Sequence, residues 1–193
     1  MQVCVYCASS AKIDSIYFDA TSKLAKEFVH HNVDVVFGGG SSGLMGQLAD
    51  SVLANGGKIK GIMPQFMNDV EWGHKGVSDF VYTQSMHERK AKFLEGTDAL
   101  VALPGGVGTF EELFEAITLK KLGQFTKPIV VLNTKNYFEP FRTLIQHACD
   151  EGFMGIEYME SFTLVNEPHE VLPTIIKMAN WTKGLLDAGK YRH

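Results

Sequence analysis

The chain has 193 residues, of which 45% are hydrophobic and 21% are charged. This composition is typical of a globular protein with a substantial core, and we expect residues 1–193 to form a single domain. The formal net charge of -4 argues against a nucleic-acid partner and against a membrane partner.

Residues 1–7 predict the first strand, which contains the C-x-x-C sequence Cys4-Val5-Tyr6-Cys7. Side chains three positions apart on a strand point to opposite faces, so we do not expect a redox pair or a zinc site here. Three cysteines in total also predict no disulfide framework. Because the sequence shows neither a signal peptide nor an apolar run that could span a bilayer, we expect a cytoplasmic protein.

Helices and strands alternate along the rest of the chain. The apolar spacing predicts helices at residues 15–31, 47–54, 86–96, 110–122, 138–150 and 168–183, and strands at 33–37, 58–63, 80–83, 98–103, 128–133 and 162–165. Residues 65–79 lack periodicity and are interpreted as a long loop, a type of segment that often binds or covers a ligand.

This alternation predicts an α/β fold with a doubly wound, Rossmann-like, mostly parallel sheet and helices on both faces. The ligand site of such a sheet lies at the carboxyl ends of the strands, where the strand order reverses. The loops after Cys7, Phe37 and Leu103 follow strand carboxyl ends and could converge on one crevice.

The first glycine-rich segment, residues 38–43, fits the pattern G-x-G-x-x-G. A dinucleotide fingerprint also needs an acid near the end of the next strand, and residues 58–63 contain none. Lys58 or Lys60 could meet a 2′-phosphate instead, which leaves an NADP-dependent oxidoreductase as an alternative. Neither glycine-rich segment ends in Gly-Lys-Ser/Thr, so a P-loop is excluded.

Two basic residues, Arg89 and Lys90, lie near the start of the predicted helix at 86–96. A solvated helix face is the ordinary interpretation of such charges. Positive charge at a helix start opposes the helix dipole, however, so this position favours a nearby anionic partner, either a ligand or Glu112.

The strongest signal is Leu103-Pro104-Gly105-Gly106-Val107-Gly108-Thr109-Phe110-Glu111-Glu112, which joins a buried strand to a helix. Three glycines in four positions let the backbone approach a ligand closely, because no Cβ intervenes. The free N–H groups and the positive dipole end of the helix favour an anion such as phosphate, with the Glu112 carboxylate beside it. The simpler alternative is a structural turn in which Glu111 and Glu112 only complement the helix dipole.

Other kinds of site find little support in the sequence. No His, Cys and acid residues have the spacing of metal ligands, and there is no G-x-S-x-G elbow of a serine hydrolase.

Two motifs together resemble a known family. Residues 104–112 match P-G-G-x-G-T-x-x-E, residues 86–90 match M-H-x-R-K, and residues 39–46 are similar to the segment G-G-G-x-x-G-L-M-G. From the first strand to about residue 150, the chain resembles the LONELY GUY (LOG) family of cytokinin riboside 5′-monophosphate phosphoribohydrolases, long labelled lysine decarboxylase-like. One departure is Ala8, where many members have glycine in C-G-S-S.

The resemblance implies a homodimer with active sites near the subunit interface, and no metal or organic cofactor. It implies hydrolysis of the N-glycosidic bond of a purine nucleoside 5′-monophosphate to the free base and ribose 5-phosphate. By matching position, Arg89 and Glu112 are the expected catalytic pair, with Glu112 stabilising an oxocarbenium-like ribose or activating water. The expected substrate-binding residues are Gly39, Gly40, Ser41, Glu71, Met86, Lys90, Gly105, Gly106, Val107, Gly108, Thr109 and Thr118.

Alternatives remain beside this hypothesis. A non-catalytic nucleotide or cofactor carrier on the same fold would also use glycine-rich loops, although it has no evident need for Arg89 and Glu112. A pyridoxal-phosphate decarboxylase is disfavoured, because neither motif offers a convincing Schiff-base lysine. Within the enzyme hypothesis, AMP and an N6-prenylated AMP are both open as the substrate.

Overall fold

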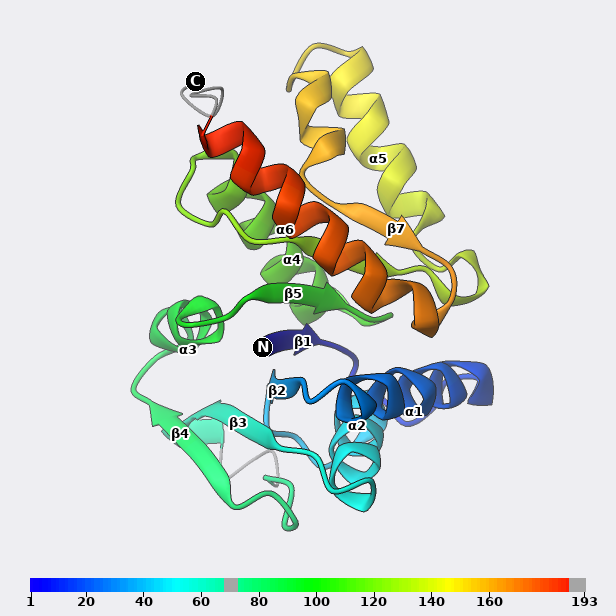
Figure 1. Ribbon diagram of the computed structural model, residues 1–193, viewed down its shortest axis with the longest axis vertical. Coiled ribbons are helices and arrows are strands. Elements are labelled where there is room, and N and C mark those ends of the chain that lie inside the picture. The colour runs from blue at the N-terminus through cyan, green and yellow to red at the C-terminus, as the bar shows by residue number, and fades with distance from the viewer. Residues whose placement is uncertain (68–72, 188–193) are drawn as a thin grey trace.

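The computed structural model describes residues 1–67 and 73–187, with side chains described as far as residue 179. Its centre is a seven-stranded parallel sheet in the order β4-β3-β2-β1-β5-β6-β7 (Figure 1). The α/β, doubly wound architecture predicted from the sequence is therefore confirmed. The strands are β1 (Gln2–Tyr6), β2 (Asp34–Phe37), β3 (Ile59–Pro64), β4 (Asp79–Thr83), β5 (Ala99–Ala102), β6 (Ile129–Leu132) and β7 (Thr163–Val165).

Helices cover both faces of the sheet and make two separate cores. The helices are α1 (Ser15–His30), α2 (Gly43–Ala54), α3 (Met86–Leu94), α4 (Val107–Lys121), α5 (Glu139–Asp150) and α6 (Val171–Asp187). Apolar side chains of α1, α2 and α6 pack on one face, and those of α3, α4 and α5 pack on the other. No helix in the described ranges combines the length and the apolar character that crossing a membrane requires.

The two faces also separate the thiols of the C-x-x-C sequence. Cys4 packs in the core beneath α3, α4 and α5, whereas Cys7 packs in the core beneath α1 and α2. The opposite placement of the two side chains is the one expected from their spacing on a strand, and both cysteines are free.

The strand order reverses between β1 and β5. The chain runs outward from β1 to β4 and returns to place β5 against the other edge of β1. The two connections that leave these strands are hydrogen-bonded, since Ala8 N–H donates to the Pro104 carbonyl at 3.2 Å. This is the switch point at which a doubly wound sheet offers a ligand site.

The main differences from the predicted elements are the starts of α2 and α4. Helix α2 begins at Gly43, four residues before the predicted start, with Ser42 as the N-cap. Helix α4 begins at Val107, three residues before the predicted start, with Gly106 as the N-cap. Low helix propensity had placed Gly108 outside the helix, but a first turn tolerates glycine when tertiary structure fixes the helix. Glu111 and Glu112 consequently lie beyond the first turn, which contains no acidic residue.

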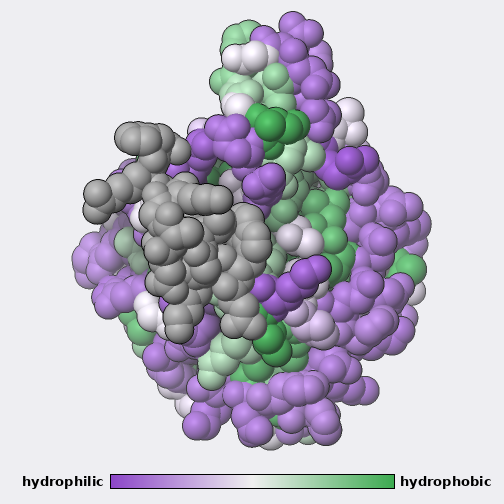
Figure 2. Space-filling view, turned by 45° about the horizontal axis from the view of Figure 1, so that its top comes forward, coloured by the Kyte–Doolittle hydropathy of each residue, from purple (hydrophilic) through white to green (hydrophobic). Residues whose placement is uncertain are grey.

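The surface is mainly polar, with apolar side chains in small patches, on the face shown in Figure 2. Three of the exposed apolar residues lie on α4 or directly after it. Val107 is 85% exposed, Phe114 is 36% exposed, and Leu122, which caps the carboxyl end of the helix, is 64% exposed. Helix α4 thus packs one side on the sheet and presents apolar side chains on the other.

Candidate active site

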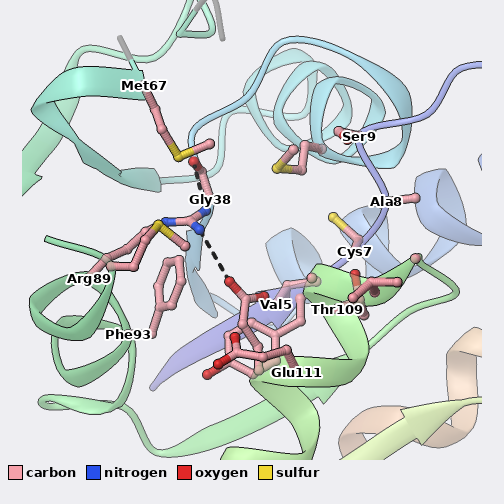
Figure 3. Close-up of a pocket in the computed structure, with 17 residues that line it drawn as sticks. Val5, Cys7, Ala8, Ser9, Gly38, Met67, Arg89, Phe93, Thr109 and Glu111 are labelled. Carbon is pink, nitrogen blue, oxygen red and sulfur yellow. Dashed lines mark hydrogen bonds and ion pairs between the residues drawn. The ribbon is translucent and has the colours of Figure 1, made fainter. Parts of the chain in front are cut away.

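A cavity of about 320 Å³ lies at the carboxyl ends of the central strands. Its lining includes residues 7–9 after β1, residue 38 after β2 and residues 106–109 after β5. The three loops that the sequence analysis expected to converge therefore do so. Figure 3 shows Arg89 and Phe93 on one side of the cavity and Cys7 and Thr109 on the other.

The amino end of α4 opens into this cavity. Gly106 is the N-cap, no side chain caps the helix, and the first turn has no acid to neutralise the dipole. The first N–H groups of a helix lack intrahelical partners, so this end can bind an anion.

Two glycines of this segment have no internal reason to be glycine. Neither Gly106 nor Gly108 has a positive φ, and a Cβ on either residue would meet nothing within 4 Å. A ligand that needs the space would account for them. Gly105 is different, because a Cβ there would collide with the side chain of Thr109.

The amino end of α2 is occupied from within. The carbonyl of Ala8 accepts hydrogen bonds from Leu44 N–H at 2.9 Å and Met45 N–H at 3.3 Å. Although residues 38–43 match a nucleotide-binding pattern, the N–H groups that would bind phosphate there already have a partner.

The glycines of this first segment serve its own folding. Gly39 has φ +82° and lies against Phe80, while Gly43 has φ +62° and lies against the backbone of Ser9. Gly39, Gly40 and Ser41 were expected to bind substrate, but the structure does not bring them to the cavity wall.

Arg89 is a buried cation at the centre of the site, only 8% exposed. Its Nε donates to the Ile62 carbonyl at 3.1 Å, and one Nη donates to the Gly38 carbonyl at 3.4 Å. The other Nη pairs with Glu112 at 3.3 Å (Figure 3). Phe93 lies under the guanidinium, 4.8 Å from its ring centroid, and the solvated-face interpretation of Arg89 is thus excluded.

Glu112 faces the cavity from the second turn of α4. Burial raises the pKa of its carboxyl group to about 7, with Arg89 acting in the opposite direction and Glu111 adding to the rise. A carboxyl group with this pKa can exchange a proton near neutral pH, which is the property of a general base.

Lys90 does not line the cavity. Its ammonium group pairs with Glu111 and with Glu115, at 3.0 Å for the latter, and these contacts raise the pKa of Lys90. The residue therefore ties α3 to α4 and offsets part of the negative charge of Glu111 and Glu115 beside the Arg89–Glu112 pair.

The other expected site residues divide between the cavity and the surface. Met86, Val107 and Thr109 line the cavity. Thr118 is on the exposed side of α4, where its hydroxyl donates to the Phe114 carbonyl. Glu71 lies outside the described residues.

Several residues of the cavity were not identified from the sequence. Gly38 is the most important, because a Cβ there would lie 2.6 Å from the guanidinium of Arg89. Its place directly after β2 was an available signal. Cys7, Met45 and Met67 also line the cavity. They lie in or beside segments that the sequence had marked, but the residue types themselves gave no reason to select them.

The two lysines that could bind an NADP 2′-phosphate lie away from the cavity. Lys58 and Lys60 lie at the amino edge of the sheet, opposite the cavity, and Lys60 pairs with Asp79 at 3.4 Å. Across residues 1–67 and 73–179, whose side chains are described, no three His, Cys, Asp or Glu side chains are grouped as metal ligands.

Comparison with known sequences identifies relatives across most of the chain. Residues 45–175 match a family model described as a possible lysine decarboxylase. The chain is 41% identical to cytokinin riboside 5′-monophosphate phosphoribohydrolase LOG2 of Arabidopsis thaliana over 154 residues, 80% of this chain and 72% of that protein. It is 36% identical to the probable enzyme LOGL1 of Oryza sativa subsp. japonica over 182 residues, 94% of this chain and 80% of that protein.

Comparison with solved structures shows the same fold in more distant proteins. The molybdenum cofactor carrier protein of Chlamydomonas reinhardtii superposes with a TM-score of 0.69 at 19% identity, covering 92% of this chain and 96% of that one. The molybdenum cofactor binding protein of Rippkaea orientalis superposes with a TM-score of 0.65 at 16% identity, covering 92% and 94%. At such identities the likeness concerns the fold alone.

The open space at Gly108 generates a first prediction. Gly108→Ala should raise the free energy of unfolding by about 0.5–1 kcal/mol, since alanine suits a helix better than glycine. The same methyl group would enter the cavity and weaken binding of inorganic phosphate. Denaturant unfolding and phosphate titration calorimetry would test both effects. Unchanged phosphate affinity would show that this end of α4 is not the anion site.

The raised pKa of Glu112 generates a second prediction. A carboxyl group whose pKa is higher in the folded state contributes stability below its unfolded value, near 4.5, and loses it as the pH rises through about 7. Glu112→Gln, which cannot ionise, should therefore gain stability relative to the wild type between pH 5 and pH 8, by about 2–3 kcal/mol. Denaturant unfolding at both pH values gives the difference. Parallel stability profiles of the two proteins would contradict the raised pKa.

Proposed function

The chain belongs to the LOG family of cytokinin riboside 5′-monophosphate phosphoribohydrolases, and we propose that it hydrolyses the N-glycosidic bond of a purine nucleoside 5′-monophosphate. The products are the free base and ribose 5-phosphate. The observation that carries the proposal is the buried Arg89–Glu112 pair, which lines the same cavity as the open amino end of α4. A carrier needs the anion site but not a buried carboxylate beside it.

The amino end of α4 binds the 5′-phosphate in this proposal. The N–H groups of residues 106–109 and the helix dipole supply the attraction, and Gly106 and Gly108 leave room for the phosphate oxygens. Binding energy at the phosphate then holds the ribose with C1′ toward Glu112.

Glu112 carries the chemical step. Cleavage of the bond between C1′ and the base leaves an oxocarbenium-like ribose, which an adjacent carboxylate stabilises. The carboxylate also takes a proton from the attacking water as the water oxygen bonds to C1′, and the departing base nitrogen takes up a proton from solvent water. Arg89, fixed by the carbonyls of Ile62 and Gly38, holds Glu112 in position.

The wall of the cavity supports an N6-prenylated adenine as the preferred base over plain adenine. Met45, Met67 and Met86 all line the cavity. Methionine side chains are apolar and adapt their shape, so they suit a branched alkyl substituent. AMP would bind the same phosphate and ribose groups but leave this wall without its apolar partner.

We further propose a homodimer built on the exposed side of α4. Val107, Phe114, Thr118 and Leu122 recur on this side at helical spacing, and the apolar members are partly or largely exposed. An interface here would bring Thr118 toward the partner's cavity, which fits its expected role in substrate binding.

The three free cysteines are consistent with the reducing cytoplasm that we expect for this protein.

The activity is tested by chromatography of reactions with AMP and with N6-isopentenyl-AMP. Release of base and ribose 5-phosphate is expected, faster with the prenylated nucleotide. Glu112→Gln should lower kcat by about 100-fold or more.

In the wild type, kcat/KM should fall as the pH drops below about 7, because Glu112 becomes protonated.

The exposed residue Glu151 gives a control with the same change of charge, and Glu151→Gln should retain full activity. If neither nucleotide is cleaved while one still raises the melting temperature, the protein is a carrier and the proposed hydrolysis is wrong.

The dimer is tested by light scattering of purified variants. Leu122→Glu places a charge on the exposed side of α4 and should produce monomers with reduced activity. Ile176→Glu is the matched control, since Ile176 is 57% exposed but lies on α6. Dimers that tolerate Leu122→Glu as well as Ile176→Glu would rule out this interface.

A further inference from the structure

A tyrosine outside the cavity holds the phosphate-binding segment. The hydroxyl of Tyr137 donates to the Gly105 carbonyl at 2.6 Å, across 32 positions of sequence. Burial raises the pKa of Tyr137, with Tyr17 adding to the rise, so the hydroxyl stays protonated as a donor. Tyr137 does not line the cavity, whereas Gly106 does.

This hydrogen bond fixes the direction of an N–H group that Tyr137 never touches. The peptide between Gly105 and Gly106 is planar and trans, so its carbonyl and its N–H point in opposite directions. Because Tyr137 holds the carbonyl, the N–H of Gly106 is turned away from Tyr137. Among the described residues, no backbone acceptor takes this N–H.

The ring of Tyr137 is held by other aromatic rings. It stacks on Phe110 of α4 at 6.3 Å between centroids, and it meets Tyr17 of α1 edge-on at 6.0 Å. These contacts use the ring and not the hydroxyl. The ring position therefore survives removal of the oxygen atom.

The backbone before Tyr137 is unusual and firmly fixed. Lys135 and Asn136 both have φ +58°, a left-handed conformation that costs energy for residues with a side chain. A hydrogen bond and a solvent-exposed ion pair support it: Asn136 N–H donates to the Asn133 carbonyl at 2.9 Å, and Lys135 pairs with Asp14 at 2.7 Å. Strained backbone at this position is consistent with a function for the contact that it places.

We infer that Tyr137 is a positioning residue for catalysis, which orients the Gly106 N–H toward the 5′-phosphate by holding the Gly105 carbonyl. The inference rests on the proposed function, because it names a residue that acts on the same phosphate site. Glycine at 105 and 106 leaves the peptide free to rotate, so an external contact is needed to preorganise it.

The test is Tyr137→Phe, which removes only the hydroxyl. Calorimetry should show binding of ribose 5-phosphate weakened by about fivefold or more, the effect of one lost hydrogen bond. Binding of free adenine, which lacks the phosphate, should be unchanged. In the nucleotide assay KM should rise more than kcat falls. General loosening of the site would instead weaken both ligands.

Tyr17→Phe is the matched control, since it removes a hydroxyl from the same aromatic group without touching Gly105. It should bind ribose 5-phosphate like the wild type. If Tyr137→Phe binds and turns over like the wild type, the inference is wrong and the proposed function stands. If the wild-type protein neither cleaves nucleotides nor binds ribose 5-phosphate, both are wrong.

Discussion

The burial of the Arg89 guanidinium is the constraint on which the rest of the site depends. An arginine removed from water needs acceptors for its N–H groups, or the cost of burial is prohibitive. The structure supplies them from three elements: the carbonyls of Ile62 in β3 and Gly38 after β2, and the carboxylate of Glu112 in α4. Each acceptor can serve only if α3, α4 and the strand ends hold fixed positions. The cation thus couples the sheet to the helices that carry the chemistry.

The two glycine-rich segments differ in function: the first stabilises the fold, and the second is open to a ligand. Both connect a strand to a helix at the same edge of the sheet, and both resemble phosphate-binding loops. In the first, the Ala8 carbonyl occupies the N–H groups at the start of α2. In the second, no side chain caps α4, and the Gly106 and Gly108 positions open onto empty space. The difference lies in what covers each helix end, because the carbonyl partner at the start of α2 has no counterpart at the start of α4.

The sequence predicted the parts of this structure that depend on local periodicity. Alternating elements fixed the parallel sheet, and strand ends at Cys7, Phe37 and Leu103 located the cavity. The rest depends on contacts between distant segments. The Ala8 carbonyl accepts hydrogen bonds from the first N–H groups of α2, and the Tyr137 hydroxyl donates to the Gly105 carbonyl. Neither contact produces a pattern in the local sequence that could have predicted it. The early start of α4 was missed because tertiary packing outweighs the low propensity of Gly108.

Gly38 carries no functional group, yet the geometry of the ion pair depends on it. Any larger residue would place a Cβ 2.6 Å from the Arg89 guanidinium, so that the arginine or the backbone at position 38 would have to shift. A lineage with this fold could therefore abandon hydrolysis through a change at position 38 while its arginine and glutamate remained intact. The presence of the two charged residues alone is consequently not enough to infer the activity. The absence of a side chain at position 38 has to be considered with them.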